Sequence, residues 1–408
     1  MPDDQPLHGI RVIDLGQYIA GPSVAQTLSD LGADVIKVES PGGDQARSVG
    51  PFGEAMVRAY NRDKRSIALN LRAGEGRGIL HRLIADADVL VGNFRHGSAD
   101  RLGIGPQTLS EKYPRLVHAS ITGFGTGGPS SARPGLDIAA QAEFGLMHMT
   151  GAGDGEPQRV GAAVADVSAA NAVVHGILAA LFRRERTGRG GHVESSLMEA
   201  TLAVQAAVWG EYQLTGKPPR RRGNGQANAA PAADVVEVAD GHIVVSAYAS
   251  AKWLALCRLI GRPDLATDPR FLDNPSRVVN RPALLAVLAE AFSSLTRAQA
   301  VAMLDSAGIV CGAVRAYDEI DRDEDVEASG ILVQVADPGG EDYRVPGQAF
   351  TVDGARRHAS AAAPVVGAHT VEILTDLGYS PDAIDAMYTR GAVAGVPRHE
   401  PIPRKVAL

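Results

Sequence analysis

Short apolar runs alternate with segments of helical spacing along the first part of the chain, and this alternation limits the folds that it can adopt. Residues 10–15 (IRVIDL) and 34–39 (DVIKVE) predict two short buried strands. Between them, apolar residues recur at helical spacing after Gly21-Pro22 as far as Gly32, which predicts a helix with a glycine C-cap. Such a unit pairs its strands in parallel through a right-handed crossover. We therefore predict an α/β fold built on a parallel sheet.

The same alternation continues, and it indicates a long chain with more than one core. Residues 65–71, 88–94 and 116–121 predict three further strands, and residues 74–86 predict a helix. At 408 residues, the chain exceeds the length at which one hydrophobic core usually stops growing. We expect at least two domains.

The glycine-containing turn after the first predicted strand brings two nucleotide-binding classes to mind, and it fits neither. Residues 16–23 (GQYIAGPS) have the glycine spacing of a P-loop, but Pro22 stands where that loop requires a lysine. The turn also lacks the G-x-G-x-x-G pattern of dinucleotide-binding folds, although Glu39 lies near the position of a ribose-binding acid. We interpret Glu39 as a solvated strand end and set both classes aside.

Polar and aromatic residues follow the ends of the third and fourth predicted strands, and they are candidates for ligand binding. They are Arg72, Asn93, Phe94, Arg95 and Arg101. Ligands of open α/β sheets bind beyond the carboxyl ends of the strands, and cations beside an aromatic ring suit a phosphorylated adenine nucleotide. The alternative is a solvated loop with a packed phenylalanine, and these residues alone leave both interpretations open.

One carboxylate, Asp166, stands at the head of an apolar run with helical spacing in residues 161–181. A charge among Ala, Val and Gly is costly to desolvate unless it is paired or used in chemistry. Asp166 can be a helix N-cap, and a carboxylate kept ionised at a helix N-terminus can also be a nucleophile. Upstream, Asp137 and Gln141 interrupt another apolar run, where we expect capping and hydrogen bonding within the fold.

Composition argues against several classes of partner. The net charge of −7 disfavours nucleic acid or an anionic membrane surface as the main partner. The two cysteines, Cys257 and Cys311, are far apart, which fits buried thiols in a reducing compartment and offers no metal cluster. Because no charged-then-apolar leader and no apolar run of membrane-spanning length stand out, we expect a soluble, cytoplasmic protein.

The composition changes in the second half of the chain. Residues 216–234 are rich in Pro, Gly and Arg, which predicts a linker or flexible loop. Residues 235–327 predict a separate small α/β domain, in which Thr296 and Gln299 form a capping box. From residue 330 the chain returns to short strands and a last helix, which we expect to rejoin the first domain or to reach across a partner chain.

Taken together, these motifs resemble the class III CoA-transferase family, the CaiB–BaiF group, over nearly the whole chain. The stretches that carry the resemblance are LHGIRVIDL with the later AGP, LGADVIKVESPGGD, NRDKRSIALNL, ADVLVGNFRHG, LDIAAQAEFGLMHMTG, GAAVADVSAANAVVHGILAAL, RTGRG and AGIVCGAV. Each stretch is weak by itself, and their common order is the specific signal. The resemblance implies a Rossmann-like large domain from residues 1–220 and 329–408, an inserted small domain from 221–328, and an interlaced homodimer.

The resemblance also assigns functional residues. The nucleophilic aspartate of the family falls on Asp166. The coenzyme A contacts fall on Leu69, Arg72, Asn93, Phe94 and Arg101, to which we add Asp137. A mobile glycine loop over the active site falls roughly on residues 223–226 (GNGQ). Coenzyme A enters as an acyl-CoA substrate, the second substrate is a small carboxylic acid, and no metal is expected.

Two alternatives to CoA transfer stay open at this point. An acyl-CoA racemase of the same family pairs the aspartate with a histidine, whose place in PGLD is taken here by Leu136, while His148 and His175 match no motif. A non-catalytic CoA-binding protein would need Asp166 to be only a helix cap. The substrates are not legible, although Ile19 departs from the glutamine of oxalate-specific members and suggests a less polar acid.

Overall fold

The computed structural model describes residues 5–225, 233–247 and 249–396, which form two compact units. The large unit comprises Met1–Phe144, Val160–Trp209 and Asp325–Leu408, and the small unit comprises Gly145–Arg159 and Gly210–Glu324. Both ends of the chain thus belong to the large unit. The division into domains at residues 220/221 and 328/329 remains a prediction.

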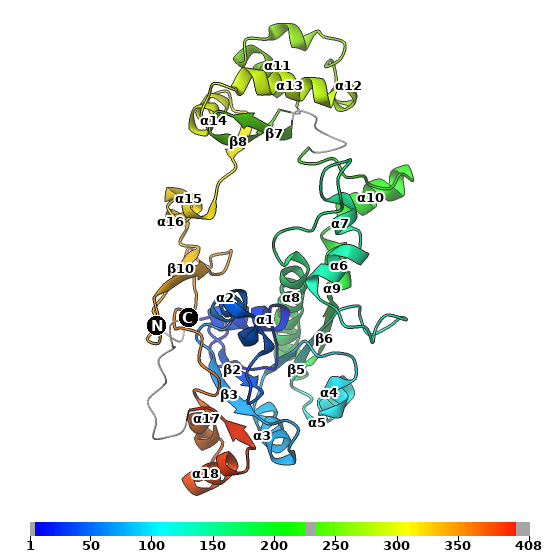
Figure 1. Cartoon of the computed structure of the whole chain (residues 1–408). Coiled ribbons are helices and arrows are strands. Elements are labelled where there is room, and N and C mark those ends of the chain that lie inside the picture. The colour runs from blue at the N-terminus through cyan, green and yellow to red at the C-terminus, as the bar shows by residue number, and fades with distance from the viewer. Residues whose placement is uncertain (1–4, 226–232, 248, 397–408) are drawn as a thin grey trace. The chain divides into compact units, whose positions relative to one another are not determined.

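A seven-stranded sheet forms the centre of the large unit (Figure 1). Its strands are β1 (Arg11–Asp14), β2 (Asp34–Glu39), β3 (Arg65–Leu69), β4 (Val89–Gly92), β5 (Val117–Thr122), β6 (Gly191–Ser196) and β12 (Val393–Ala394). They lie in the order β12-β3-β2-β1-β4-β5-β6, with β1 to β6 parallel and β12 antiparallel to β3. The predicted parallel α/β sheet is confirmed. From β1 the chain first adds β2 and β3 on one side of the sheet and then β4, β5 and β6 on the other, so the strand order reverses between β1 and β4. Doubly wound sheets bind ligands at such a reversal point.

Helices cover both faces of this sheet because successive strand residues point to opposite sides. On one face, Val12 and Val35 pack against helices α1 (Ala20–Asp30) and α8 (Val164–Thr187). On the other face, Ile13 and Ile36 belong to a second core together with α3 (Gly74–Ala85). The other helices and short strands of this unit are α2 (Gly50–Tyr60), α4 (Ser98–Arg101), α5 (Pro106–Lys112), α6 (Asp137–Glu143), α9 (Leu197–Ala203), α17 (Thr370–Asp376), α18 (Pro381–Thr389), β10 (Leu332–Val335) and β11 (Tyr343–Pro346).

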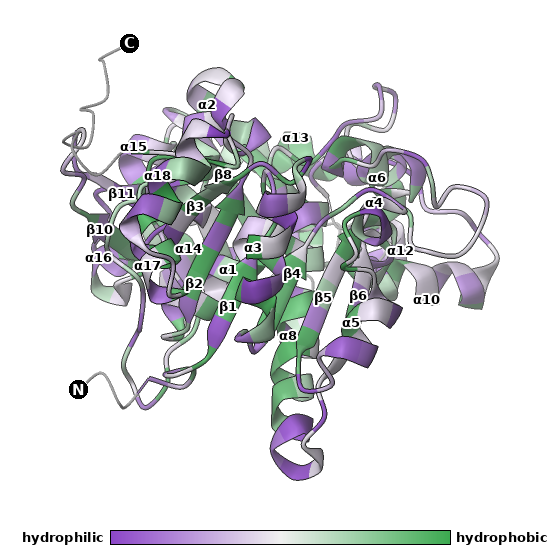
Figure 2. Ribbon diagram, turned by 90° about the horizontal axis from the view of Figure 1, so that it is seen from below, coloured by the Kyte–Doolittle hydropathy of each residue, from purple (hydrophilic) through white to green (hydrophobic). Residues whose placement is uncertain are grey.

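Helix α8 is long and apolar enough to cross a membrane by length and composition, which corrects the expectation that no run reaches that length. In this fold it is a core helix, because Ala169, Val173 and Ile177 are fully buried against the sheet. Figure 2 shows α8 apolar over most of its length and hydrophilic at its end, where Arg184 and Arg186 lie in the last turn.

The C-terminal segment rejoins the large unit, so the first of the two outcomes expected for it is confirmed. Helices α17 and α18 (red in Figure 1) lie beside β3 and α3, and Ile373, Leu374 and Ile384 are buried in the same core as the α3 side chains. Strand β12 then adds to the edge of the sheet through β3. Residues 370–394 are therefore part of the domain that carries the carboxyl ends of β1 and β4.

The small unit contains a three-stranded antiparallel sheet of β7 (Ala233–Val238), β8 (Gly241–Ser246) and β9 (Val310–Ala313). Its helices include α11 (Ser250–Leu259), α12 (Asn274–Val279), α13 (Arg281–Phe292), α14 (Arg297–Ser306) and α15 (Tyr317–Ile320). The predicted capping box of Thr296 and Gln299 is present at the start of α14. Cys257 is buried as predicted, whereas Cys311 is only half-buried.

Two stretches of the chain differ from the sequence-based expectation. Residues 198–214, whose sequence forms one long amphipathic stretch, fold as two helices, α9 and α10 (Ala206–Thr215), separated around Gln205. The Gln205 side chain donates hydrogen bonds to the carbonyl oxygens of Phe144 and Thr201, which stabilises the break. The predicted linker at 216–234 already contains the start of β7, and residues 226–232 lie outside the described part.

Candidate active site

A cavity of about 550 Å³ lies in the large unit at the carboxyl ends of β1, β4 and β5. Its walls come from the turn after β1 (residues 17–20), the loop after β4 (93–98), the segment 131–139 and the first turn of α8, where Asp166 lies. The volume is within the range of small-molecule binding sites. The cavity thus occupies the position that the reversal of strand order predicts for a ligand.

Close contacts between glycines bring the walls of this cavity together. A Cβ atom on Gly16 would stand 2.7 Å from the backbone of Gly21, and one on Gly123 would stand 2.6 Å from the Cα atom of Gly135. Real Cβ atoms do not approach other atoms so closely, so each pair requires glycine on both sides. The glycines after β1 and β5 therefore allow two backbone segments of the cavity wall to lie in direct contact.

Asp166 is the third residue of α8, and it is not the helix N-cap. The N-cap position belongs to Ala163, and no side chain of that residue caps the helix. Within the part of the chain that the structure describes, no hydrogen bond or ion pair engages the Asp166 carboxylate, which is half-buried on the cavity wall. The N-cap interpretation of Asp166 is therefore wrong, and its carboxylate is available to a ligand.

Asp137 performs the capping that the sequence suggested for Asp166. The amide N–H of Ala165 donates to Asp137 Oδ1 at 2.8 Å, and Gln141 Nε2 donates to Asp137 Oδ2 at 2.7 Å. The Gln141 Oε1 atom in turn accepts from the amide of Val160 at 2.9 Å. The expected capping and hydrogen bonding at these two positions is confirmed. The Asp137 side chain is 9% exposed and engaged by these donors within the fold, so it lies beneath the cavity wall.

The environment of Asp166 changes its acidity. Burial, and then the nearby negative charge of Asp137, raise the pKa of the Asp166 carboxyl to about 7. Burial and the charge of Asp166 likewise raise the pKa of the Tyr60 phenol. Since perturbed acids gather where chemistry is done, this half-buried, unpartnered carboxyl marks the cavity as a candidate active site.

Two of the predicted coenzyme A contacts, Asn93 and Phe94, line the same cavity as Asp166. The Asn93 side-chain amide is already used, because its Oδ1 accepts from the amide of Gln17 and its Nδ2 donates to the Gln17 carbonyl, each at 2.9 Å. The Phe94 ring lies over Gly92, where a Cβ atom would meet it at 2.5 Å. Phe94 therefore presents the half-buried aromatic surface that the sequence suggested.

The other predicted contacts lie outside the cavity lining. Leu69 is fully buried in the core of the sheet, so its side chain does not face a ligand. Arg72 is exposed just beyond β3, and Arg101 is exposed in α4, where it donates to Ser98 Oγ at 2.7 Å. Both arginines follow strand ends as predicted, at positions open to a phosphate.

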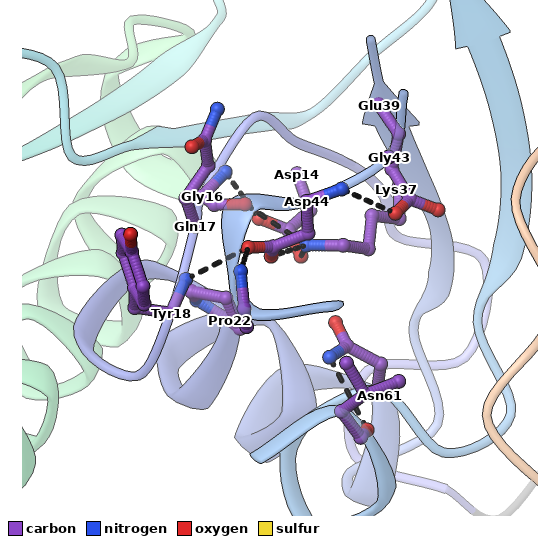
Figure 3. A network of polar contacts seen from close by, with 12 residues as sticks. Asp14, Gly16, Gln17, Tyr18, Pro22, Lys37, Glu39, Gly43, Asp44 and Asn61 are labelled. Atoms are coloured by element: carbon purple, nitrogen blue, oxygen red, sulfur yellow. Dashed lines mark hydrogen bonds and ion pairs between the residues drawn. The ribbon is translucent and has the colours of Figure 1, made fainter. Parts of the chain in front are cut away.

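A network of buried charges, which was not predicted from the sequence, lies under the turn after β1 (Figure 3). Lys37 Nζ lies 3.0 Å from Asp44 Oδ2, and Lys64 Nζ lies 2.8 Å from Asp14 Oδ2, all four side chains being almost fully buried. The signal was present, because Asp14 and Lys37 interrupt apolar strands and buried charges must be paired. The position of the partners was not visible in the sequence.

Glu39 belongs to this network, so its interpretation as a solvated strand end is wrong. The side chain is 4% exposed and binds Arg47, Ser66 and the amide of Asp44. Its oxygens are thus occupied within the protein.

Cationic side chains approach the cavity from its rim. Arg95 lines it and is exposed, and the Arg95 guanidinium has no partner among the described residues. Arg133 also lines it, paired with Glu143 and stacked over the ring of Phe124. These groups offer positive charge to an anionic ligand.

The predicted glycine loop belongs to the small unit. The amide of Gly223 donates to the carbonyl of Gly151, whereas Gln226 lies outside the described residues. Among the residues that are described, no group of three or more His, Cys, Asp or Glu side chains could hold a metal ion.

A doubly wound sheet has a cavity at its reversal point, and a half-buried carboxylate lies on the cavity wall. This arrangement is typical of an α/β enzyme that binds a small molecule. The model of CoA-transferase family III matches residues 7–370. The chain belongs to this family and is a CoA-transferase.

Relatives agree with this assignment. The chain is 36% identical to a succinyl-CoA:mesaconate CoA-transferase from Haloarcula marismortui, over 91% of this chain and 96% of that protein. It is 40% identical to an acetyl-CoA:oxalate CoA-transferase from Acetobacter aceti, over 75% and 80% respectively. The crystal structure of a CaiB/BaiF family protein from Brucella suis superposes with a TM-score of 0.81 at 37% identity, covering 91% of this chain and 99% of that one.

Proposed function

We propose that the enzyme moves coenzyme A from an acyl-CoA to a short dicarboxylic acid through a thioester on Asp166. The observation that carries this proposal is the Asp166 carboxylate itself. It is half-buried on the wall of the cavity and has no hydrogen-bond or ion-pair partner among the described residues. A carboxylate without a structural partner in such a place is available as a nucleophile.

The reaction proceeds in four transfers. The Asp166 carboxylate attacks the thioester carbonyl of the donor, which forms a mixed anhydride and releases coenzyme A thiolate. The thiolate then attacks the Asp166 carbonyl, giving the aspartyl-CoA thioester and the first free acid. The acceptor carboxylate attacks this thioester, and the released thiolate takes the acyl group from the second anhydride. Asp166 is regenerated as a carboxylate, and each tetrahedral oxyanion needs N–H donors.

A dicarboxylic acceptor is supported by two observations. The relatives described above are named for mesaconate and oxalate, which are both dicarboxylic acids. Arg95 also lines the cavity with an unpartnered guanidinium, which could bind the carboxylate that does not react. Ile19, which also lines the cavity, favours an acid less polar than oxalate.

Racemisation is the weaker candidate. Leu136 is 61% exposed and lines the cavity where a racemase of this family would carry its histidine, and a leucine cannot exchange a proton. His175 is exposed on α8 and is not part of the cavity lining.

The assignments of coenzyme A contacts to Leu69, Arg72, Phe94 and Arg101 belong to the same proposal, whereas the side chains of Asn93 and Asp137 are engaged within the fold and are not proposed as contacts. We expect Arg72 and Arg101 to hold phosphates, Phe94 to offer a face to the adenine or the pantetheine arm, and Leu69 to act only through its backbone. A cytoplasmic location, where acyl-CoA is at hand, completes the proposal.

We further propose an interlaced homodimer. The resemblance implies it, and large apolar side chains such as Phe182 and Leu214 are exposed by 68% and 86% in the single chain. Light scattering on the purified enzyme tests this, and a monomer at micromolar concentration would contradict it.

The chemistry is tested by trapping. The enzyme is incubated with succinyl-CoA, quenched with hydroxylamine or borohydride, and digested for mass spectrometry. We expect a hydroxamate or a reduced side chain at Asp166, none in Asp166→Asn, and CoA exchange in a donor-by-acceptor screen. Exchange that persists in Asp166→Asn would refute the proposal.

A further inference from the structure

The turn after β1 is held by side chains rather than by backbone pairing at three successive residues. At its centre, Gln17 exchanges two hydrogen bonds of 2.9 Å with the side-chain amide of Asn93, through both its N–H and its carbonyl. Asn93 comes from the end of β4, across the reversal point of the sheet. One lone pair of Oδ1 and one hydrogen of Nδ2 are used in this way, so the two bonds to Gln17 fix the orientation of the Asn93 amide.

The buried ion pair holds the two ends of the same turn (Figure 3). Lys37 Nζ donates to the carbonyl of Gly16 at 2.9 Å and to Asp44 Oδ2 at 3.0 Å. Asp44 Oδ1 accepts from the amide of Tyr18 at 3.1 Å. Lys37 and Asp44 are 0% and 3% exposed and do not line the cavity. Their bonds end on the backbone atoms of the turn.

Tyr18 shows that this clamp holds an unfavourable conformation. Its φ angle of +60° lies in the left-handed region, which is uncommon for a residue with a large side chain. The bond from its amide to Asp44 and the bond from its phenol to Gln45 Oε1 compensate for this. Gln17, Tyr18 and Gln45 all line the cavity.

We propose that Asn93, Lys37 and Asp44 are positioning residues that act through the turn Gly16–Tyr18, which they lock as one wall of the acyl-CoA cavity. Asn93 is then not a coenzyme A contact through its side chain. This inference rests on the proposed use of the cavity for acyl-CoA. It adds that the affinity for coenzyme A depends on residues that do not touch it.

The test is a double-mutant cycle between Asn93→Ala and Asp44→Asn. In Asp44→Asn the side-chain oxygen can still accept from Tyr18, but its NH₂ group faces the Lys37 ammonium, so the clamp opens. Titration with free coenzyme A and the KM for succinyl-CoA are measured for each variant. We expect each single change to raise the dissociation constant of coenzyme A and the KM for succinyl-CoA about tenfold, with kcat changed much less. Because both residues hold one turn, we expect the two constants in the double variant to rise by much less than the product of the two single effects.

Asp30→Asn is the matched control. Asp30 is as buried as Asp44 and pairs with Arg62. It is the last residue of α1, whereas the turn Gly16–Tyr18 precedes the start of that helix, and it does not line the cavity. We expect a lower melting temperature in this variant and a KM within twofold of the parent. A rise in KM equal to that of Asp44→Asn would mean that any buried charge loss has this effect, and would overturn the proposal.

A measurement without activity separates this inference from the proposed function. Hydrogen exchange of the Gln17 and Tyr18 amides should be slow in the parent and fast for Gln17 in Asn93→Ala, without global unfolding. Unchanged exchange, or losses of affinity that multiply in the double variant, would overturn the positioning role. The trapped adduct on Asp166 in the parent enzyme tests the reaction itself, so the two can fail separately.

Discussion

The carboxylate of Asp137 lies close enough to Asp166 for its negative charge to raise the pKa of the Asp166 carboxyl. Asp137 accepts the amide of Ala165, the residue just before Asp166 on α8, so the helix that presents the candidate nucleophile also anchors the second acid. Burial and this neighbour together bring the pKa of Asp166 to about 7. A more basic carboxylate is a stronger nucleophile, and it ionises within the physiological range.

The first prediction concerns the pH dependence of adduct formation on Asp166. Because only the carboxylate attacks and the pKa is raised to about 7, the rate should climb through pH 7 and fall about tenfold per unit below pH 6. Single-turnover trapping with succinyl-CoA between pH 5 and 9 measures it. A rate that is flat down to pH 5 would show that Asp166 keeps an ordinary carboxyl pKa.

The second prediction concerns stability. The pKa of Asp166 is raised from 3.8 to about 7 in the folded protein. Between these two pH values the folded protein holds a proton that the unfolded chain has lost. The free energy of unfolding therefore falls as pH rises through this window. Asp166→Asn, which carries no charge, should therefore become more stable than the parent between pH 5 and 8. We expect the free energy of unfolding of Asp166→Asn to exceed that of the parent by about 1–2 kcal/mol. This is less than the free energy equivalent of the whole pKa shift, because the carboxyl is only half-buried.

Urea unfolding at pH 5 and pH 8 measures this difference, with Asp268→Asn as control. The hydrogen bond from the Arg270 side chain holds the pKa of the half-buried Asp268 below its ordinary value, so this group stays ionised across the window. Its contribution is lost only in more acidic solution, and the difference between Asp268→Asn and the parent should not change from pH 5 to 8. A gap for Asp166→Asn that is equally constant would contradict the raised pKa.

The sheet was predictable because its signals are local. Strands β1, β2 and β4 are each a short apolar run, and α1, between the first two, shows the apolar period of a helix within a few turns. Such continuous apolar runs are typical of strands buried on both faces of a parallel sheet. The assignment of the nucleophilic aspartate of the family to Asp166 also relied on a short stretch of sequence. Neither the sheet nor this assignment required knowledge of which segments pack together.

The relationships that define the site are not local. Asp137 and Ala165 are 28 residues apart, and Asn93 and Gln17 are 76 residues apart, so neither hydrogen bond follows from spacing. From the sequence, Asn93 was therefore a candidate ligand contact and Asp166 a candidate cap as well as a nucleophile, whereas in the structure Asn93 binds Gln17 and the cap is Asp137. The buried Lys37 was visible as a charge within an apolar strand, and only its partner was hidden.

The third prediction tests the close packing of the cavity wall. In Gly135→Ala the new methyl group would collide with the backbone of Gly123, so the segment that lines the cavity must shift. We expect a loss of about 1–3 kcal/mol in unfolding free energy and a KM for succinyl-CoA raised about tenfold. Gly127→Ala in the same loop is the control, because nothing lies within 4 Å of its added Cβ atom. Equal effects of the two changes would show that loop flexibility, and not contact, matters.

The last prediction separates the charge of Asp137 from its capping of helix α8. In Asp137→Asn the side-chain oxygen can still accept the Ala165 amide, so the helix stays capped, while the hydrogen bond from Gln141 Nε2 is lost and the negative charge beside Asp166 is removed. Since that charge raises the pKa of Asp166, the acid limb of adduct formation should move to lower pH. The limb does not return to that of an ordinary carboxyl, because burial is the larger cause and remains. A purely structural role for Asp137 would lower the rate at every pH and leave the limb in place.

Glu143→Gln is the matched control for this last variant, since Glu143 lies on the same helix α6 but is exposed and paired with Arg133. Removing its charge should leave the acid limb where it is. Tyr60, the other ionisable group that interacts with Asp166, is neutral at these pH values because its own pKa is raised, so it cannot produce the limb. A shift in Asp137→Asn that is absent in Glu143→Gln therefore reports the carboxylate pair itself. An equal shift in both would assign the effect to the general negative charge of α6.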